Sequence, residues 1–349
     1  MGILARRPPF RTLLVASTIS LVGDWMSFVA LASLSIGTDD GFVGLAWVFA
    51  VHALPKVMLA PWAGLAADRF DKRTVMLVAN VVQTVLTLGM ALAAYHVDVG
   101  ALRLLVFVRS AVSAFHTPAE SASVPMLVEK HELTLANAFM STSWGATLVL
   151  GMALGGLVAM LGPTYSMLLD AGTFALASAL LAFLPRLPPD TVAPADAHVA
   201  RATREAFRVL ADASHLLRAF LAKSSVSVPA GAAFVLMHAV AKRTFSPAEL
   251  PLMLGVLQAM RGAGTLVGPF TTTVLGARGL PITRALVVAD VLVVVGLFAM
   301  LMPDALALGV ASLVVGIGHG TNWMISTTVI QREASLYTER RIALDDRRR

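Results

Sequence analysis

Cysteine is absent from the 349-residue chain, and its absence excludes several kinds of chemistry at once. Without thiols the chain forms no disulfide framework, no thiolate metal site and no intermediate on a cysteine nucleophile. Other reactive signatures are missing too, since the sequence holds no Gly-rich phosphate loop ending in Lys-Ser or Lys-Thr, no His-Glu-x-x-His helix and no Gly-x-Ser-x-Gly turn. We therefore expect no ATP-driven activity, no enzyme, no metal and no cofactor.

Charged residues are scarce as well. They make up 14% of the chain against 57% hydrophobic residues, and the mean hydropathy is +0.77. A soluble domain carries about 25% charged residues, so this composition indicates a protein whose solvent is lipid. The net charge of +6 would suggest nucleic acid in a soluble protein. Here, however, the basic residues lie between hydrophobic blocks, where they set membrane orientation, and we expect no nucleic-acid partner.

Long hydrophobic runs recur through almost the whole chain. A helix needs about 20 apolar residues to cross about 30 Å of hydrocarbon, and these runs have that length. They predict an all-α, polytopic membrane bundle with six spans in an N-terminal half and four in an incomplete C-terminal half. The expected spans are 13–36, 43–66, 74–95, 101–117, 136–160, 164–184, 220–241, 251–275, 283–302 and 305–330.

A polar, Pro-rich stretch divides the two sets of spans. It predicts an N-terminal half at 1–185, a cytoplasmic linker at 186–218, a C-terminal half at 219–331 and a cytoplasmic tail at 332–349. The linker pattern fits a basic amphipathic helix on the inner leaflet, and a plain tether fits equally well. Because Lys and Arg gather on every second loop, we expect both termini in the cytoplasm.

Polar residues inside the first span indicate where function lies, because an ionisable side chain at mid-bilayer costs about 2.5–3.5 kcal/mol. Ser17, Ser20, Asp24 and Ser27 are spaced three, four and three apart and share one helical face. We expect this face to line a cavity. The alternative, which the pattern leaves open, is that Asp24 is buried against a Lys or Arg purely for assembly.

The fourth span repeats this arrangement. Arg109, Ser113, His116 and Glu120 fall on one face, and Arg109 is the natural partner for a carboxylate inside the membrane. His116 can titrate near neutral pH, although a single histidine near a helix end is more often a hydrogen-bonded structural residue.

Other spans carry fewer polar side chains, which we expect to line the same cavity. Each of them can equally serve to hold helices together. These candidates are Lys56, Gln83, Arg261 and Asn322. Asp170 and Asp290 are single acids near the ends of their spans and stay ambiguous. Glycines in the fifth and eighth spans predict close helix crossings.

The loop between the second and third spans carries a recognisable motif, Gly64-Leu65-Ala66-Ala67-Asp68-Arg69-Phe70-Asp71-Lys72-Arg73. It closely resembles the signature loop of the major facilitator superfamily. We expect Gly64 to permit a close approach, and Asp68 to accept hydrogen bonds from Arg69 or Arg73. With Lys72, these residues would form a latch that closes in one transporter state and opens in another.

The region from Phe10 to Gln331 resembles the macrolide-efflux and siderophore-exporter branch of that superfamily. The resemblance rests on Gly23-Asp24-Trp25 in the first span, on Thr117-Pro118-Ala119, and on Arg109, where many members carry arginine. It implies a secondary transporter of a bacterial plasma membrane that exports a small amphipathic compound in exchange for protons. Asp24 would carry or gate the proton, and Arg109, His116 and Glu120 would assist it.

Members of this branch usually have twelve spans. Residues 339–345 look like the loop that leads into span eleven, and the chain ends shortly after them. The resemblance therefore leaves a rival interpretation, in which the chain is a truncated, non-transporting remnant or a membrane assembly subunit.

Overall fold

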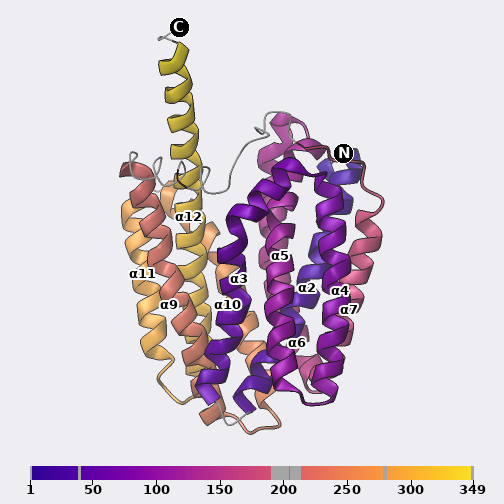
Figure 1. The fold of residues 1–349 in the computed structure, drawn as a ribbon. Helices are drawn as coiled ribbons and strands as arrows, with labels where there is room; N and C mark the ends of the chain where they lie inside the picture. Colours follow the sequence, from indigo (N-terminus) through magenta and orange to yellow (C-terminus); the bar gives the residue numbers. More distant parts are fainter. Residues whose placement is uncertain (1, 38–40, 190–203, 205–213, 278–280, 347–349) are drawn as a thin grey trace. The chain divides into compact units, whose positions relative to one another are not determined.

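The computed structural model describes residues 2–37, 41–189, 204, 214–277 and 281–346, and within these ranges it is helical without strands. The all-α prediction is confirmed. Figure 1 shows helices that run side by side within each part of the chain. They are α1 (Ile3–Arg6), α2 (Pro8–Gly37), α3 (Gly41–Arg69), α4 (Lys72–Tyr95), α5 (Val99–Leu127), the 3-10 helix η1 (Lys130–Glu132), α6 (Leu133–Ala159), α7 (Pro163–Leu181), α9 (Ser214–Thr244), α10 (Leu250–Ala277), α11 (Ile282–Ala299) and α12 (Ala305–Asp346).

Each expected span coincides with one long helix. Among the described residues, seven of these helices are long and apolar enough to cross a membrane, and α3, α9 and α11 are not among the seven. The division into six and four spans stays a prediction. The expected linker helix falls on residues that are largely outside the described ranges.

The chain forms two compact units. Unit 1 holds Met1–Val199 with Phe245–Ala259, and unit 2 holds Ala200–Thr244 with Met260–Arg349. The division falls inside α10, so the first residues of that helix belong to unit 1.

In unit 1, α2 packs against α3, α6 and α7, while α4 and α3 both pack against α5. Glycines permit the close crossing of α6 over α2. A β-carbon at Gly155 would lie 2.9 Å from the Cα of Met26, and one at Gly151 would lie 2.8 Å from the carbonyl oxygen of Val22. The predicted close crossing at the fifth span is confirmed.

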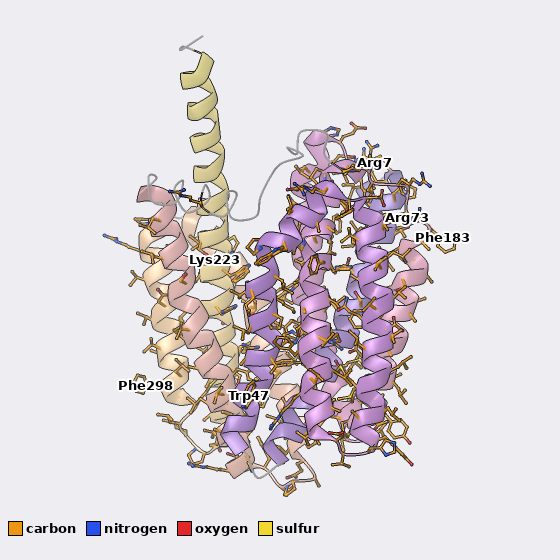
Figure 2. All side chains as sticks on the ribbon, in the orientation of Figure 1. Arg7, Trp47, Arg73, Phe183, Lys223 and Phe298 are labelled. Atoms are coloured by element: carbon orange, nitrogen blue, oxygen red, sulfur yellow. The ribbon has the colours of Figure 1, made fainter. Side chains whose placement is uncertain are left out.

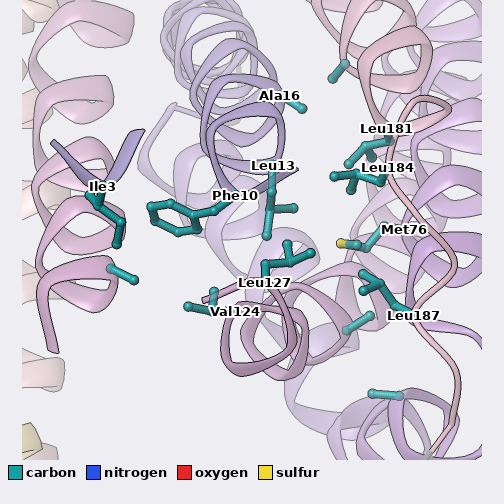
Figure 3. Close-up of a cluster of buried hydrophobic side chains, with 14 residues drawn as sticks. Ile3, Phe10, Leu13, Ala16, Met76, Val124, Leu127, Leu181, Leu184 and Leu187 are labelled. Carbon is teal, nitrogen blue, oxygen red and sulfur yellow. The ribbon is translucent and has the colours of Figure 1, made fainter. Parts of the chain in front are cut away.

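One end of unit 1 is closed by a buried apolar cluster (Figure 3). Phe10 and Leu13 of α2 meet Met76 of α4, Leu127 of α5 and Leu181 of α7, and each of these side chains is at most 8% exposed. Burying such side chains stabilises the packing of four helices at their ends.

The distribution of polarity in the helices is inverted relative to a soluble protein. In α4, Asn80 and Gln83 are buried, whereas Val85 and Leu92 are exposed. Figure 2 shows Phe183 and Phe298 pointing outward, and they are 83% and 69% exposed. Water would penalise such a surface and lipid would not, so the exposed apolar faces support the membrane assignment.

In unit 2, α12 packs against α9 and α11. Gly264 and Gly268 of α10 lie against the backbone of α12, as the glycines of the eighth span predict. The helix α12 continues to Asp346, past the expected end of the span at 330. Its last part, rich in Glu, Arg, Ala and Leu, has high helix propensity and projects beyond α9 and α11 in Figure 1.

Candidate functional site

Arg109 of α5 lies at the centre of an ion cluster in unit 1. Its side chain is buried, and its Nη1 donates to Oδ2 of Asp170 on α7 at 2.6 Å and to Oγ1 of Thr87 on α4 at 3.2 Å. Its Nη2 forms an ion pair with Asp24 of α2. One guanidinium therefore holds together α2, α4, α5 and α7.

The two carboxylates that bind Arg109 have different surroundings. The Asp170 side chain is 0% exposed and accepts a second hydrogen bond, from Oγ of Ser27 at 2.6 Å. The Asp24 side chain is 22% exposed and borders a cavity. Asp170 is thus the dry member of the cluster, and Asp24 is the member that the cavity reaches.

Gly23 explains how α7 comes close enough to α2 for Asp170 to reach the cluster. A β-carbon at Gly23 would lie 2.0 Å from Oγ1 of Thr173 and 2.6 Å from Oδ1 of Asp170, so any larger residue would force these α7 side chains to shift. The approach of α7 to α2 that lets Asp170 and Asp24 share Arg109 therefore requires a glycine next to Asp24.

The cavity beside Asp24 has a volume of about 60 Å³ and lies within unit 1. Carboxyl, hydroxyl, amide and imidazole groups from α2, α4 and α5 line most of it. The lining residues are Ser17, Ser20, Leu21, Asp24, Asn80, Gln83, Ser113, His116, Thr117, Glu120 and Phe174. Among the sequence candidates, the cavity thus unites Asp24, His116, Glu120, Ser20 and Gln83.

The other candidate residues lie elsewhere. Ser27 faces Asp170 and does not line the cavity. Lys56 lies in α3 with its Nζ 3.1 Å from Nε2 of His52. In unit 2, Nδ2 of Asn322 donates to Oδ1 of Asp290 at 2.8 Å, and the guanidinium of Arg261 lies 5.7 Å from the ring centre of Phe234. Lys56, Arg261 and Asn322 therefore do not line the cavity of unit 1.

The loop between α3 and α4 is tied to the segment after α7. Asp71 caps α4 by accepting from the backbone N of Thr74 at 2.8 Å, and its second oxygen accepts from the backbone N of Leu187 at 2.7 Å. Lys72 is fully buried, and its Nζ donates to the carbonyl of Pro188 at 3.3 Å. Partial burial raises the pKa of Asp71, but the hydrogen bonds from Thr74 and Leu187 together lower it more, so the net pKa lies below its ordinary value.

The expectation for Gly64 is wrong, and a hydrogen bond from Arg69 to Asp68 stays a prediction. Arg73 donates to the carbonyls of Leu181 and Ala182 and not to Asp68, because its place on α4 brings the guanidinium to the C-terminus of α7, where free carbonyls attract a cation. A β-carbon at Gly64 would meet no described atom within 4 Å, so no close approach requires glycine there. Asp68 and Arg69 are exposed.

Asp170 is the residue whose importance the sequence did not reveal. It is the single acid in α7, with only Ser166 four residues before it and Thr173 three residues after it as polar neighbours at helical spacing. A weaker signal was present: Ser166, Asp170, Phe174 and Ala177 follow one another at spacings of three and four, and all are buried. That pattern places the acid on the packed face of the helix.

Comparison with known proteins adds to this geometry. The sequence pattern described as Major Facilitator Superfamily matches residues 13–340. The chain is 29% identical over 177 residues to the "Uncharacterized MFS-type transporter YfiS" of Bacillus subtilis, covering 50% of this chain and 42% of that protein. It is 24% identical to "Macrolide efflux protein A" of Enterococcus faecalis, covering 45% of this chain and 50% of that protein. The chain thus spans half or less of the length of these two relatives.

A longer match joins the chain to the "Multidrug efflux pump Tap" of Mycobacterium tuberculosis, with 26% identity over 97% of this chain and 82% of that protein. Two solved structures share the fold. One is the nucleoside transporter NupG, with a TM-score of 0.72, 12% identity and coverage of 95% of this chain and 86% of that one. The other is a bacterial homolog of the human lysosomal transporter Spinster, with a TM-score of 0.68, 16% identity and coverage of 95% and 79%.

Proposed function

The chain belongs to the Major Facilitator Superfamily, and from that premise we propose that it is a secondary transporter that exports a small amphipathic compound in exchange for protons. The family is one of membrane transporters, which confirms that the chain is not an enzyme. The efflux proteins among its relatives support export and point to a macrolide-like compound as the substrate class. The bacterial sources of these relatives support a place in the bacterial inner membrane.

The observation that carries the coupling proposal is the cluster of Asp24, Arg109 and Asp170, which borders the cavity at Asp24. With both carboxylates ionised, two negative charges face one positive charge. A single proton makes the cluster neutral. In a medium of low dielectric an unbalanced charge is energetically unfavourable, so this neutralisation stabilises the cluster. The cluster therefore takes up and releases one proton as a unit.

Asp24 is the route by which that proton reaches the cluster, because it borders the cavity and Asp170 does not. A hydrogen bond between a guanidinium and a carboxylate is roughly twice as strong as one to a neutral group. Protonation of Asp24 consequently loosens α2 from α5, while Asp170 keeps Arg109 attached to α7. A membrane potential contributes about 2.3 kcal/mol per charge per 100 mV, so one proton per cycle supports useful export.

The proposal is tested by the accumulation of a radiolabelled macrolide in cells with and without the protein, each measured with and without a protonophore. We expect the protein to lower accumulation and the protonophore to remove the difference. Asp24→Asn should behave like the protonophore while the protein is still made and inserted.

A matched control is Asp98→Asn. Asp98 caps α5 at the backbone N of Ala101, outside the cluster and the cavity, and Asn is an equally good capping residue. The control should export like the unaltered chain. Full, protonophore-sensitive export by Asp24→Asn would refute the coupling role, and macrolide accumulation unaffected by the unaltered protein would refute macrolide export.

A further inference from the structure

The cavity of unit 1 contains buried polar atoms that nothing in the described structure satisfies. Oγ of Ser17, Nδ2 of Asn80 and Oε1 of Glu120 all belong to lining residues, and none has a hydrogen-bond partner among the described residues. Ser17 is 5% exposed and Asn80 is 1% exposed. Buried polar atoms without partners are rare because they cost free energy, so the cavity is built for a polar occupant.

The charged residues around the cavity indicate the sign of the occupant's charge. Asp24 and Glu120 line the cavity, and Arg109 pairs with Asp24 and with Asp170. No Lys or Arg is part of the described lining. His116 also lines the cavity, and with the three carboxylates ionised even a charged His116 leaves the summed charge negative. The occupant therefore carries positive charge.

The size of the cavity limits the occupant to a small group. A volume of about 60 Å³ holds a few water molecules or one ammonium group, but not the body of an amphipathic compound.

We propose that this cavity is a binding site for a small monovalent cationic group, either the ammonium group of an amine-bearing compound or a free alkali cation. Oε1 of Glu120 and Oγ of Ser17 bind the cation directly, and Nδ2 of Asn80 donates to a water molecule bound beside it. That the cation is the headgroup of the exported compound rests on the proposed function, whereas cation binding itself rests on the cavity alone.

The test is equilibrium binding of radiolabelled methylammonium to the purified full chain in lipid nanodiscs, at an ionic strength held constant with choline chloride. Choline has no N–H donor and is too large for the cavity. We expect saturable binding, a loss of affinity of about tenfold or more in Glu120→Gln because a charge-assisted hydrogen bond is removed, and a loss of about threefold in Ser17→Ala. The matched control is Glu249→Gln, since Glu249 is exposed and bonded to Ser246 outside the cavity.

Sodium chloride in place of choline distinguishes the two sources of the cation. Displacement of methylammonium by sodium at millimolar concentration identifies a site that also takes a free alkali cation, and no displacement identifies an ammonium site; both support the proposal. Absence of saturable binding of either cation would overturn it. So would affinities in Glu120→Gln and Ser17→Ala equal to that of Glu249→Gln.

The binding test can fail or succeed independently of the export test of the proposed function. Proton-dependent export without methylammonium or sodium binding would overturn the cation site and leave the transporter assignment in place. Saturable, Glu120-dependent binding in a protein that exports nothing would support the site and contradict export.

Discussion

Replacing Arg109 by Gln leaves two carboxylates without their cationic partner in the interior of unit 1. The structure predicts how much folding stability is lost at each of them. Asp170 is 0% exposed, so without the guanidinium it must either stay charged in a dry site or take up a proton. Protonating an ordinary aspartate with a pKa near 3.9 at pH 7 costs about 4 kcal/mol, at about 1.36 kcal/mol per pH unit. This figure agrees with the roughly 3–5 kcal/mol that breaking a buried ion pair costs.

The second carboxylate is less costly because Asp24 is 22% exposed and borders the cavity, where water can solvate its charge. The two double variants therefore differ. Arg109→Gln with Asp170→Asn leaves only the hydrated carboxylate and should recover most of the lost stability. Arg109→Gln with Asp24→Asn leaves the dry carboxylate and should recover little.

The assay is thermal unfolding of the purified protein in detergent, followed by tryptophan fluorescence. For a unit of this size about 1 kcal/mol shifts the melting temperature by roughly 2–4 °C, so Arg109→Gln should lower it by about 10 °C. Asp98→Asn controls for the loss of a carboxylate outside the cluster. Equal recovery by the two double variants, or greater recovery with Asp24→Asn, would show that the difference in burial between the two carboxylates is not what determines stability.

Two more predictions concern the packing that positions the cluster and the loops that frame it. Gly23→Ala should displace Thr173 and Asp170, because the new β-carbon would lie 2.0 Å from Oγ1 of Thr173 and 2.6 Å from Oδ1 of Asp170. We expect a loss of about 1–3 kcal/mol, measured as a lower melting temperature. Gly172→Ala, whose β-carbon would meet no described atom within 4 Å, should be neutral or slightly stabilising. A similar loss in both variants would contradict this. The hydrogen bond from Arg7, labelled in Figure 2, holds the pKa of Glu132 below its ordinary 4.5. The stability that this ion pair contributes to the attachment of the N-terminal segment is therefore fully present above pH 4.5 and is lost as the pH falls through the lower folded value. Gly2→Cys introduces the sole thiol of that variant, and a nitroxide label attached to it should become more mobile in that acidic range. Adding Glu132→Gln should make the label more mobile already at pH 7. Label mobility that changes neither with pH nor with Glu132→Gln would show that the Arg7–Glu132 ion pair does not hold the N-terminal segment.

The positions of the helices follow from local sequence, and the structure agrees with them closely. Crossing a bilayer requires a helix of about 20 apolar residues whatever it packs against, so the run 74–95 predicts α4 at Lys72–Tyr95 without knowledge of its neighbours. The ends are less determined. The span expected at 101–117 extends to Leu127 in α5, because polar residues such as Glu120 continue the helix beyond the apolar run.

Loop contacts were harder to predict than helices. The motif around Asp68 carries several charges of both signs, and sequence spacing alone pairs neighbours such as Asp68 and Arg73. The structure pairs Arg73 and Asp71 instead with the backbone of residues 181–187, more than 100 positions away. Backbone groups at a helix end have no signature in side-chain sequence, so these partners are visible only after the chain has folded.

In the candidate site, too, local sequence predicts some features and only the folded chain shows the others. Spacing alone placed Ser20 and Asp24 on one face of α2, and His116 and Glu120 on one face of α5, because helical periodicity is a local property. That Asp170 completes the cluster depends on the approach of α7 to α2 across Gly23, a contact between residues 147 positions apart that no local pattern encodes. The sequence by itself determined that charges such as Asp24 and Arg109 lie within apolar spans, where lipid penalises each of them individually. Tertiary packing alone decided that Asp170 is the driest of them and which charge neutralises which, because burial and ion pairing depend on distances between helices.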